Sequence, residues 1–306
     1  MMPTFSVVVP TYEKPAELSG CLAAVSGLDY PREQFEVIVV NDGGRSIDDA
    51  VAPFLGQMNV THFTQKHAGP SAARNAGVQR AQGKYLAFTD DDCRPDRAWL
   101  TELERHLGAD EGALVGGRVI NKLADNLWSA ASQFLVTYLY DYYNANRGQA
   151  LFFTSNNIAM TREAFLTIGG FNSQYRSTAE DREFCDRWTH AGRRMLYTET
   201  ALIRHSHQLT LRSFWRQHFR YGQGALHYRQ ERAQRDGGPL RFELLCFYTG
   251  LLRYPWTAGV PRPLRMAALL LISQMANATG FFWAKLLDRG KPSHCTLKTQ
   301  VEPPCP

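Results

Sequence analysis

The sequence predicts an α/β fold in which a mostly parallel sheet is flanked by helices. Short apolar, β-branched runs recur in the first 120 residues, and each run ends in a turn signal that precedes a helix-like segment. This alternation of strand and helix is typical of parallel sheets with helices on both faces. The composition, 44% hydrophobic and 21% charged, excludes a disordered chain.

The individual elements follow from these runs in chain order. Strands are predicted at residues 5–10, 35–40, 60–65, 84–89 and 113–120, and helices between them at 15–28, 46–55, 70–83 and 94–107. A further strand is expected at 151–161, then a helix from about Arg162, a turn at 169–172 and a helix from about Glu180. Residues 121–150 have apolar residues at helical spacing, which suits either core packing or an aromatic binding platform.

The last third of the chain changes character. We expect a basic helix over 213–234 that glycines interrupt, and an aromatic, apolar helix over 237–256. Residues 266–284 are mostly apolar with basic flanks, while Ser273, Gln274 and Asn277 form a narrow polar stripe. This pattern favours a helix in a membrane interface over one that docks on the protein's own body or spans the bilayer. The tail at 292–306 is predicted to be disordered.

Cysteine use and charge limit the setting of the protein. The six cysteines form no CxxC pair and no cluster of zinc spacing, which indicates a reducing compartment. The first strand begins almost at the first residue and leaves no room for a signal peptide, so we expect the folded body in the cytoplasm. The net charge is +5, and the arginines between Arg204 and Arg241 suit either a phosphate-bearing partner or a solvated helix face.

Polar residues gather where the predicted strands end, which is where parallel sheets bind ligands. These ends read "PTYEK" at 10–14, "NDGG" at 41–44, "KHAGPS" at 66–71 and "DDDC" at 90–93. Asp90 and Asp92 project to one side of an extended segment and offer oxygen ligands to Mg²⁺ or Mn²⁺, ions that also bind substrate phosphates. Adjacent carboxylates repel one another, so they need a positive partner, and we expect a divalent cation and Arg74.

Four segments are informative in combination: "VVVPTYEKPAELSGCL", "EVIVVNDGG", "GPSAARNAGVQRAQGKYLAFTDDD" and "GGFN…AEDREFCDRWTHAG". In this order they resemble the motifs of family-2 glycosyltransferases, and the resemblance covers residues 4–224. It implies a Rossmann-like domain of the GT-A type. It also implies transfer of a sugar from a nucleotide diphosphate donor, with inversion at the anomeric carbon and with Mg²⁺ or Mn²⁺ as cofactor.

The resemblance implies roles for individual residues. The nucleotide is expected at Pro10, Thr11, Tyr12, Glu13, Asp42, Arg74, Asp90 and Asp91, with Asp42 on the base and the role of Asp91 left open. The metal is expected at Asp92, Asp90 and His205, with His207 as the second choice of histidine. Asp181 is the expected general base with Glu180 beside it, and its place at a helix start is expected to keep it ionised. Gln217, Arg220 and Tyr221 resemble a Q-x-x-R-W box that meets the diphosphate or the acceptor, with Tyr in place of Trp.

The leading interpretation is an inverting, metal-dependent glycosyltransferase that is peripheral on the inner face of the cell membrane. It would use a nucleotide-sugar donor and a saccharide or lipid-linked acceptor in polysaccharide or glycolipid synthesis. We expect a catalytic domain at 1–224, with a nucleotide-binding half at 1–120 and an acceptor half at 121–224, and a helical membrane-associating region at 225–291. No nucleic-acid partner is expected, and the oligomeric state is open.

Two other functions fit parts of the pattern. An aspartate-dependent phosphotransferase also uses aspartates at a strand end, but its nucleophile should follow the first strand, where this chain has "PTYEK". A nucleotide- or lipid-binding scaffold without turnover is the second alternative, and the presence of Asp92, Asp181 and His205 argues against it.

Overall fold

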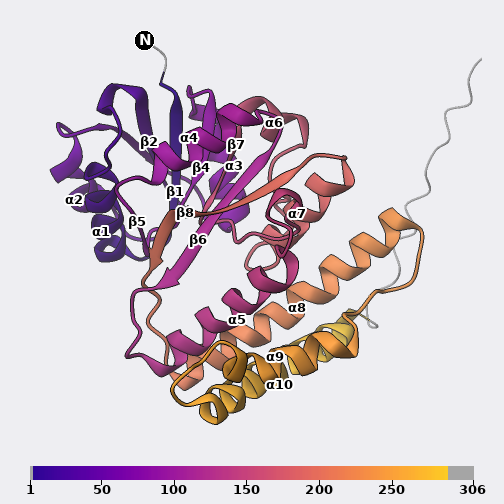
Figure 1. The fold of residues 1–306 in the computed structure, drawn as a ribbon. Coiled ribbons are helices and arrows are strands. Elements are labelled where there is room, and N and C mark those ends of the chain that lie inside the picture. The colour runs from indigo at the N-terminus through magenta and orange to yellow at the C-terminus, as the bar shows by residue number, and fades with distance from the viewer. Residues whose placement is uncertain (1–2, 289–306) are drawn as a thin grey trace, which may run out of the picture.

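The structure is a computed structural model and describes residues 3–288. The fold contains one eight-stranded sheet with helices around it (Figure 1). The strand order is β3-β2-β1-β4-β7-β6-β8-β5. The strands are β1 (Phe5–Thr11), β2 (Phe35–Asn41), β3 (Asn59–Thr64), β4 (Tyr85–Phe88), β5 (Cys93–Pro95), β6 (Leu114–Asn121), β7 (Ile158–Thr161) and β8 (Met195–His205). The first four strands in the sheet order are parallel, while β7 pairs antiparallel with both β4 and β6. The α/β class is therefore confirmed, with the parallel pattern concentrated in the N-terminal half.

Helices cover both faces of the sheet, as the alternation in the sequence predicts. Alternate residues of β1 point to opposite faces, so Val7 and Val9 pack in one core and Val8 in the other. The first core includes α1 (Pro15–Ser26) and α4 (Trp99–Ala109), and the second includes α3 (Pro70–Arg80), α6 (Arg162–Thr167) and α7 (Glu180–His190). The short helix α2 (Asp48–Val51) follows β2.

Three predicted elements are wrong in extent. The aromatic helix expected over 237–256 begins only at Leu245. The other two are a strand and a helix. The strand expected at 151–161 exists only as β7, because the side chain of Asn144 bonds the backbone N–H groups of Leu151 and Phe152 in place of a neighbouring strand. The helix expected from 94 begins only at Trp99, because Cys93–Pro95 pairs with the end of β8 as the edge strand β5. The Asn144 contacts behind the shorter strand are local, whereas the pairing of β5 with β8 behind the later helix start joins segments far apart in the sequence.

Four helices form a separate layer beside the sheet, and Figure 1 shows them together at the lower side of the molecule. They are α5 (Leu127–Tyr143), α8 (Leu211–Asp236), α9 (Leu245–Thr257) and α10 (Pro263–Asp288). The predicted interruption of the basic helix is wrong, because α8 runs unbroken through Gly222 and Gly224. A Cβ atom at Gly222 would overlap the carbonyl oxygen of Asn277, and one at Gly280 would overlap that of Phe219. These glycines therefore let α8 and α10 pack closely.

The apolar helix α10 has one packed and one exposed face. It is the one helix within residues 3–288 that is long and apolar enough to cross a membrane. The expected polar stripe faces inward, since Ser273 is buried and bonds the carbonyl oxygen of Leu270, while Gln274 and Asn277 line a cavity. The opposite face exposes large apolar side chains, namely those of Leu271, Met275, Phe282, Trp283 and Leu286. The predicted disordered tail at 292–306 lies outside the described residues.

Candidate functional site

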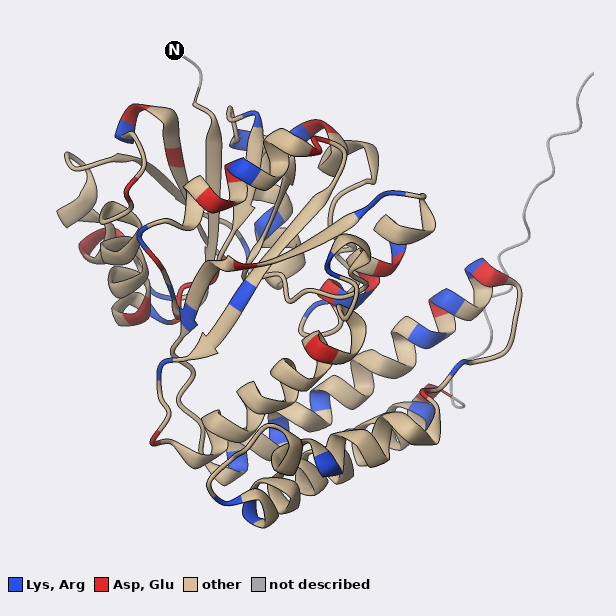
Figure 2. Ribbon diagram, viewed as in Figure 1, with Lys and Arg blue, Asp and Glu red and all other residues tan. Residues whose placement is uncertain are grey.

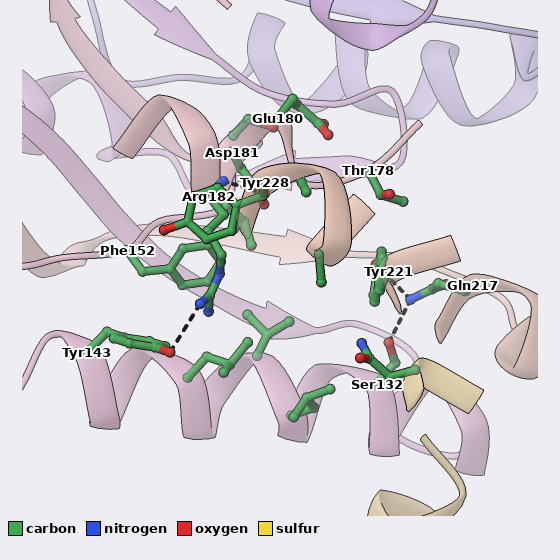
Figure 3. Close-up of a pocket in the computed structure, with 18 of the residues that line it drawn as sticks. Ser132, Tyr143, Phe152, Thr178, Glu180, Asp181, Arg182, Gln217, Tyr221 and Tyr228 are labelled. Atoms are coloured by element: carbon green, nitrogen blue, oxygen red, sulfur yellow. Dashed lines mark hydrogen bonds between the residues drawn. The ribbon is translucent and has the colours of Figure 1, made fainter. Parts of the chain in front are cut away.

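A cavity of about 590 Å³ lies between the strand ends and the helical layer. Its walls come from the Asp-rich segment after β4, the end of β8, the start of α7, and helices α5, α8, α9 and α10. The predicted site residues that line it are Arg74, Asp90, Asp92, Glu180, Asp181, His205, Gln217 and Tyr221, together with His207. Figure 3 shows Tyr143, Phe152 and Arg182 at one end of this cavity, and Ser132, Gln217 and Tyr221 at the other.

Two of the three aspartates, Asp91 and Asp92, have a positive partner that the sequence interpretation missed. The ammonium of Lys14 lies 2.9 Å from Asp92 Oδ2 and 3.6 Å from Asp91 Oδ1, and the hydroxyl of Thr11 donates to Asp91 Oδ2 at 2.8 Å. On its other side Asp92 Oδ1 lies 3.2 Å from His205 Nε2. Lys14 belongs to "PTYEK", so its place at the end of β1, beside β4, was the available signal.

These contacts separate the acids electrostatically. Burial opposes ionisation of Asp92, but His205 and Lys14 outweigh it and hold the pKa of Asp92 below its usual value. Burial, only partly offset by Lys14, raises the pKa of Asp91 to about 7. Burial also disfavours a charged His205, yet the Asp92 carboxylate raises the pKa of this imidazole. Asp92 is thus the ionised member of the pair, and Asp91 readily holds a proton.

Arg74 pairs with the Asp-rich segment, as expected, and also reaches the start of α7, which was not predicted. Its side chain is buried, with Nη2 2.6 Å from Asp90 Oδ1 and Nη1 3.4 Å from Glu180 Oε1. Burial, partly offset by Arg74, raises the pKa of Glu180. A buried guanidinium that is paired on two sides fixes the distance between the Asp-rich segment and α7.

Asp181 has the properties of a proton acceptor near neutral pH. Burial, together with the adjacent charge of Glu180, raises the pKa of Asp181 to about 7. Desolvation and the charge of Glu180 therefore oppose the ionised form that the helix start was expected to favour. The residue before the helix, Ala179, has a left-handed φ of 70°, and a Cβ at Gly224 would crowd it. Helix α8 thus packs closely against the segment that precedes the acid pair Glu180 and Asp181.

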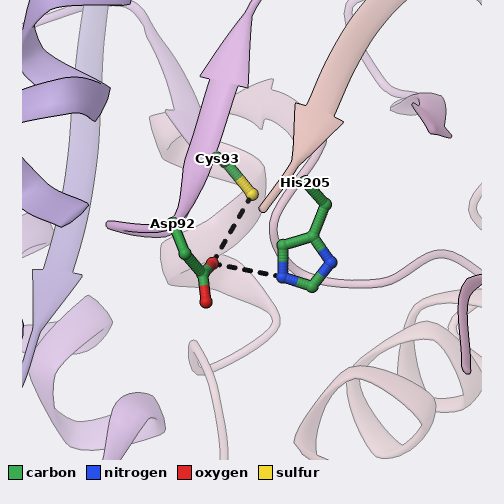
Figure 4. A group of neighbouring side chains, drawn as sticks. All are labelled: Asp92, Cys93 and His205. Carbon is green, nitrogen blue, oxygen red and sulfur yellow. Dashed lines mark hydrogen bonds and ion pairs between the residues drawn. The ribbon is translucent and has the colours of Figure 1, made fainter. Parts of the chain in front are cut away.

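A divalent cation would find suitable ligands at Asp92 and His205. The ligand atoms of Asp92, Cys93 and His205 lie within 4.8 Å of one another (Figure 4). A carboxylate oxygen and an imidazole nitrogen suit Mn²⁺, and a carboxylate with phosphate oxygens suits Mg²⁺. Burial raises the pKa of Cys93 well above its usual value, so its sulfur stays a thiol at neutral pH. Asp90 faces Arg74, which leaves Asp92 and His205 as the better placed ligands.

The residues predicted to bind the nucleobase of the donor lie at the ends of β1 and β2, outside the cavity lining. Asp42 accepts hydrogen bonds from Gln65 Nε2 at 2.7 Å and from the backbone N–H groups of Ala68 and Gly69 at 2.9 and 2.8 Å. His67 lies 2.9 Å from Asp42 Oδ2 and stacks on the ring of Tyr12 at 4.3 Å between centroids.

His67 was not predicted, although it stands in the strand end "KHAGPS". The neighbouring predicted residues differ in surroundings. Pro10 is buried in β1, whereas Glu13 has a left-handed φ of 59° and pairs with Arg45 at 3.3 Å. The structure thus gathers the predicted base residues at one sheet edge, with Glu13 turned toward Arg45.

The three residues of the predicted Q-x-x-R-Y box do not stay together. Gln217 Nε2 donates to Ser132 Oγ and to Tyr221 Oη, both at 2.9 Å, so Gln217 and Tyr221 form part of the cavity wall. Arg220 is exposed and outside the lining, and its carbonyl oxygen accepts a bond from Thr178. The predicted contact of Arg220 with a diphosphate has no support in this geometry.

Comparisons with known proteins cover most of the chain. Residues 6–169, more than half of the chain, match the family model described as glycosyl transferase family 2. Glycosyltransferase AglE of Haloferax volcanii is 33% identical over 39% of this chain and 40% of its own length. The pre-mycofactocin glycosyltransferase of Mycobacterium tuberculosis is 27% identical over 92% of this chain and 63% of its own length. The chain therefore spans less than two thirds of these curated relatives.

Solved structures share the fold over nearly the whole chain. The mannosyltransferase PcManGT from Pyrobaculum calidifontis, in complex with GDP-Man and Mn²⁺, has a TM-score of 0.63 at 21% identity and covers 95% of this chain and 82% of that one. S. aureus TarS 1-349 in complex with UDP-GlcNAc has a TM-score of 0.53 at 16% identity and covers 95% and 93%. At these identities the likeness shows the fold.

Proposed function

The chain belongs to glycosyl transferase family 2 and has the GT-A fold, and from this membership we propose that it is an inverting, metal-dependent transferase for nucleotide sugars. One observation carries the proposal. Asp181, whose pKa burial raises to about 7, lines the same cavity as the aspartates that suit a metal-bound diphosphate. An acceptor hydroxyl and a donor sugar can therefore meet in one enclosed space.

At the donor end, the proposal assigns the charged groups of the strand edge. Asp92 and His205 would hold Mg²⁺ or Mn²⁺, and the ion would neutralise charge on the departing diphosphate. The ammonium of Lys14 lies beside the same carboxylates. If a metal ion replaces Lys14 at Asp92, the ammonium would be free to pair with the diphosphate. Asp42, His67 and Tyr12 would bind the base. The complexes of PcManGT with GDP-Man and of TarS with UDP-GlcNAc support a donor of this class.

At the acceptor end, Asp181 would act as the general base. The acceptor oxygen attacks C1 of the sugar, the bond from C1 to the diphosphate oxygen breaks, and the hydroxyl proton passes to Asp181. A single displacement of this kind inverts the anomeric centre. Glu180 is held by Arg74, so it positions Asp181 and raises its pKa rather than taking the proton itself.

A membrane surface is the setting that we propose. The exposed face of α10 and the basic residues along α8 and near the α9–α10 turn, which Figure 2 shows, suit a peripheral position on an anionic bilayer. Flotation with vesicles that contain anionic lipid should recover the protein, and Trp283→Ser with Phe282→Ser should reduce the recovery. Equal recovery of the wild type on neutral vesicles, or of the variant on anionic ones, would argue against this position.

Donor binding provides the test of the function. We expect one of the UDP-, GDP- or dTDP-sugars to raise the melting temperature in the presence of Mn²⁺ or Mg²⁺, because a ligand that binds only the folded state stabilises it. Asp92→Ala should abolish the shift, whereas Asp49→Ala, an exposed control, should retain it. A shift that is independent of metal and unchanged in Asp92→Ala would contradict the proposal.

A further inference from the structure

The cavity continues beyond Asp181 into the helical layer. Its outer end is walled by α5, α8, α9 and the connection at 237–244 between α8 and α9. Apolar side chains in the lining there include Leu135, Val136, Leu139, Phe152 and Phe247, and charged side chains include Arg182, Arg229, Arg232, Asp236, Arg241 and Glu243. A ligand that carries both an apolar body and a charged group fits such a lining.

Arg229 of α8 is one of the charged side chains in this lining. Its guanidinium lies over the ring of Phe242 at 4.9 Å and that of Phe281 at 5.7 Å, and Nε donates to the carbonyl oxygen of Arg241. Within residues 3–288, Arg229 has no carboxylate at ion-pair distance. Burial lowers the pKa of Arg229, as expected for a cation that lacks a counter-ion.

The neighbouring arginines of the cavity are already paired. Arg232 lies 3.5 Å from Asp186 and 3.6 Å from Asp236, and Arg241 lies 4.0 Å from Asp236. Arg182 donates to Tyr143 Oη at 3.1 Å, and the same hydroxyl donates to Glu243 at 2.5 Å. The Glu243 carboxylate is therefore bonded to this pair rather than to Arg229. Arg229 is therefore the arginine of this lining that has no acidic partner within residues 3–288.

The apolar surface of the protein meets the cavity beside Arg229. Phe242 lines the cavity and is 57% exposed, and its ring packs on Phe281, which in turn contacts the exposed Phe282 of α10. Leu244 and Leu245, at the start of α9, are also highly exposed. Apolar side chains thus continue from the exposed face of α10 to the edge of the cavity at Phe242, where Arg229 stacks on the rings of Phe242 and Phe281.

We propose that the outer end of the cavity binds the anionic group of a membrane amphiphile, with Arg229 as the ligand of the anion and the Phe242 region as the passage for its apolar chain. The inference rests on the proposed function, since an acceptor must place its hydroxyl at Asp181. It adds the chemical class of that acceptor: an apolar chain and a phosphate or carboxylate.

Binding of three simple probes tests this inference on the intact chain. Titration calorimetry below the critical micelle concentration should show that dodecyl phosphate binds, while dodecyl maltoside and inorganic phosphate each bind at least about tenfold more weakly. Arg229→Gln should weaken dodecyl phosphate by about tenfold or more, because a charge-assisted bond is lost. The affinity of Arg229→Lys for dodecyl phosphate should lie between those of the wild type and Arg229→Gln. Arg253→Gln, which replaces an exposed arginine of α9, should bind dodecyl phosphate as tightly as the wild type.

Three results would overturn the inference. Equal binding of dodecyl phosphate by Arg229→Gln would remove the assigned residue, equal binding of dodecyl maltoside would remove the anion, and equal binding of inorganic phosphate would point to a soluble ligand. The thermal shift with nucleotide sugar and Mn²⁺, measured on the same variants, reports the proposed function separately. A normal shift with a failed probe titration rejects only the acceptor class.

Discussion

The donor end and the acceptor end of the cavity differ in how their charged side chains are paired. At the donor end each buried charge has a partner, with Lys14 and His205 on Asp92 and Arg74 on Asp90. At the acceptor end apolar and charged side chains share the lining, and Arg229 there lacks a carboxylate partner among residues 3–288. The donor end is therefore charge-balanced before any ligand arrives, whereas the acceptor end gains its counter-ion from a ligand.

Replacing Asp181, which lines the cavity shared by these two ends, should have the largest effect. Asp181→Asn removes the proton acceptor but not the donor ligands, so kcat should fall by roughly 10²–10⁴-fold while nucleotide-sugar binding stays unchanged. Product formation and the metal-dependent thermal shift, measured on the same sample, separate the two. If the variant keeps more than about a tenth of the activity, Asp181 is not the base.

The pH profile should sharpen the contrast, since Asp181 must be deprotonated to act. With a pKa of about 7, kcat should rise about tenfold per pH unit up to about pH 7 and then level off. The effect on stability has the opposite sign. The folded state holds this proton more tightly than the unfolded chain, so the contribution of Asp181 is lost as pH rises from about 4 to about 7. A rate profile that is flat between pH 5 and 8 would contradict the assignment.

Packing of the helical layer can be broken at one atom. Gly222→Ala places a Cβ against the carbonyl oxygen of Asn277, so α8 and α10 must separate, at a cost of about 1–3 kcal/mol in the free energy of unfolding. Gly238→Ala, at a position with open space around it, is the matched control. Urea unfolding gives both values, and equal stability of the two variants would show that the contact between the helices is not tight.

The smallest expected effect concerns charge balance at the donor end. Lys14→Met leaves Asp91 and Asp92 without their ammonium, and because Lys14 is partly exposed we expect a loss of only about 1 kcal/mol in stability. Saturating Mn²⁺ should close this gap, since the metal takes over the neutralisation. Unfolding with and without Mn²⁺ tests it, and a gap that persists in Mn²⁺ would mean that Lys14 acts elsewhere.

Much of the donor end could be predicted because strand ends in a parallel sheet meet at one edge. Asp42, Arg74, Asp90 and Asp92 each follow a strand or begin the next helix, so their neighbourhood depends on local pattern alone. The partner of Asp92 was harder to predict, because the pairing of Lys14 depends on the direction of a side chain rather than on its place in the sequence.

The acceptor end could not be predicted in the same way. Its shape depends on helix contacts between residues far apart in the chain, such as Gly222 with Asn277 and Phe242 with Phe281. The pKa of Asp181 shows the same limit, since the helix start alone suggested an ionised group and the burial that opposes this appears only in the folded chain. That Arg229 has no acidic partner within residues 3–288 could not be predicted either, because it depends on the nearby carboxylates lying closer to other arginines.

Helix α8 imposes one more constraint on the molecule. Within a single turn, the carbonyl oxygen of Arg220 holds Thr178, Gly224 contacts the left-handed Ala179, and Gly222 contacts α10. A helical turn is rigid because its backbone bonds are internal. The loop that leads into α7 is therefore joined through α8 to the helix that carries the exposed apolar face, and we expect a shift of one to move the other.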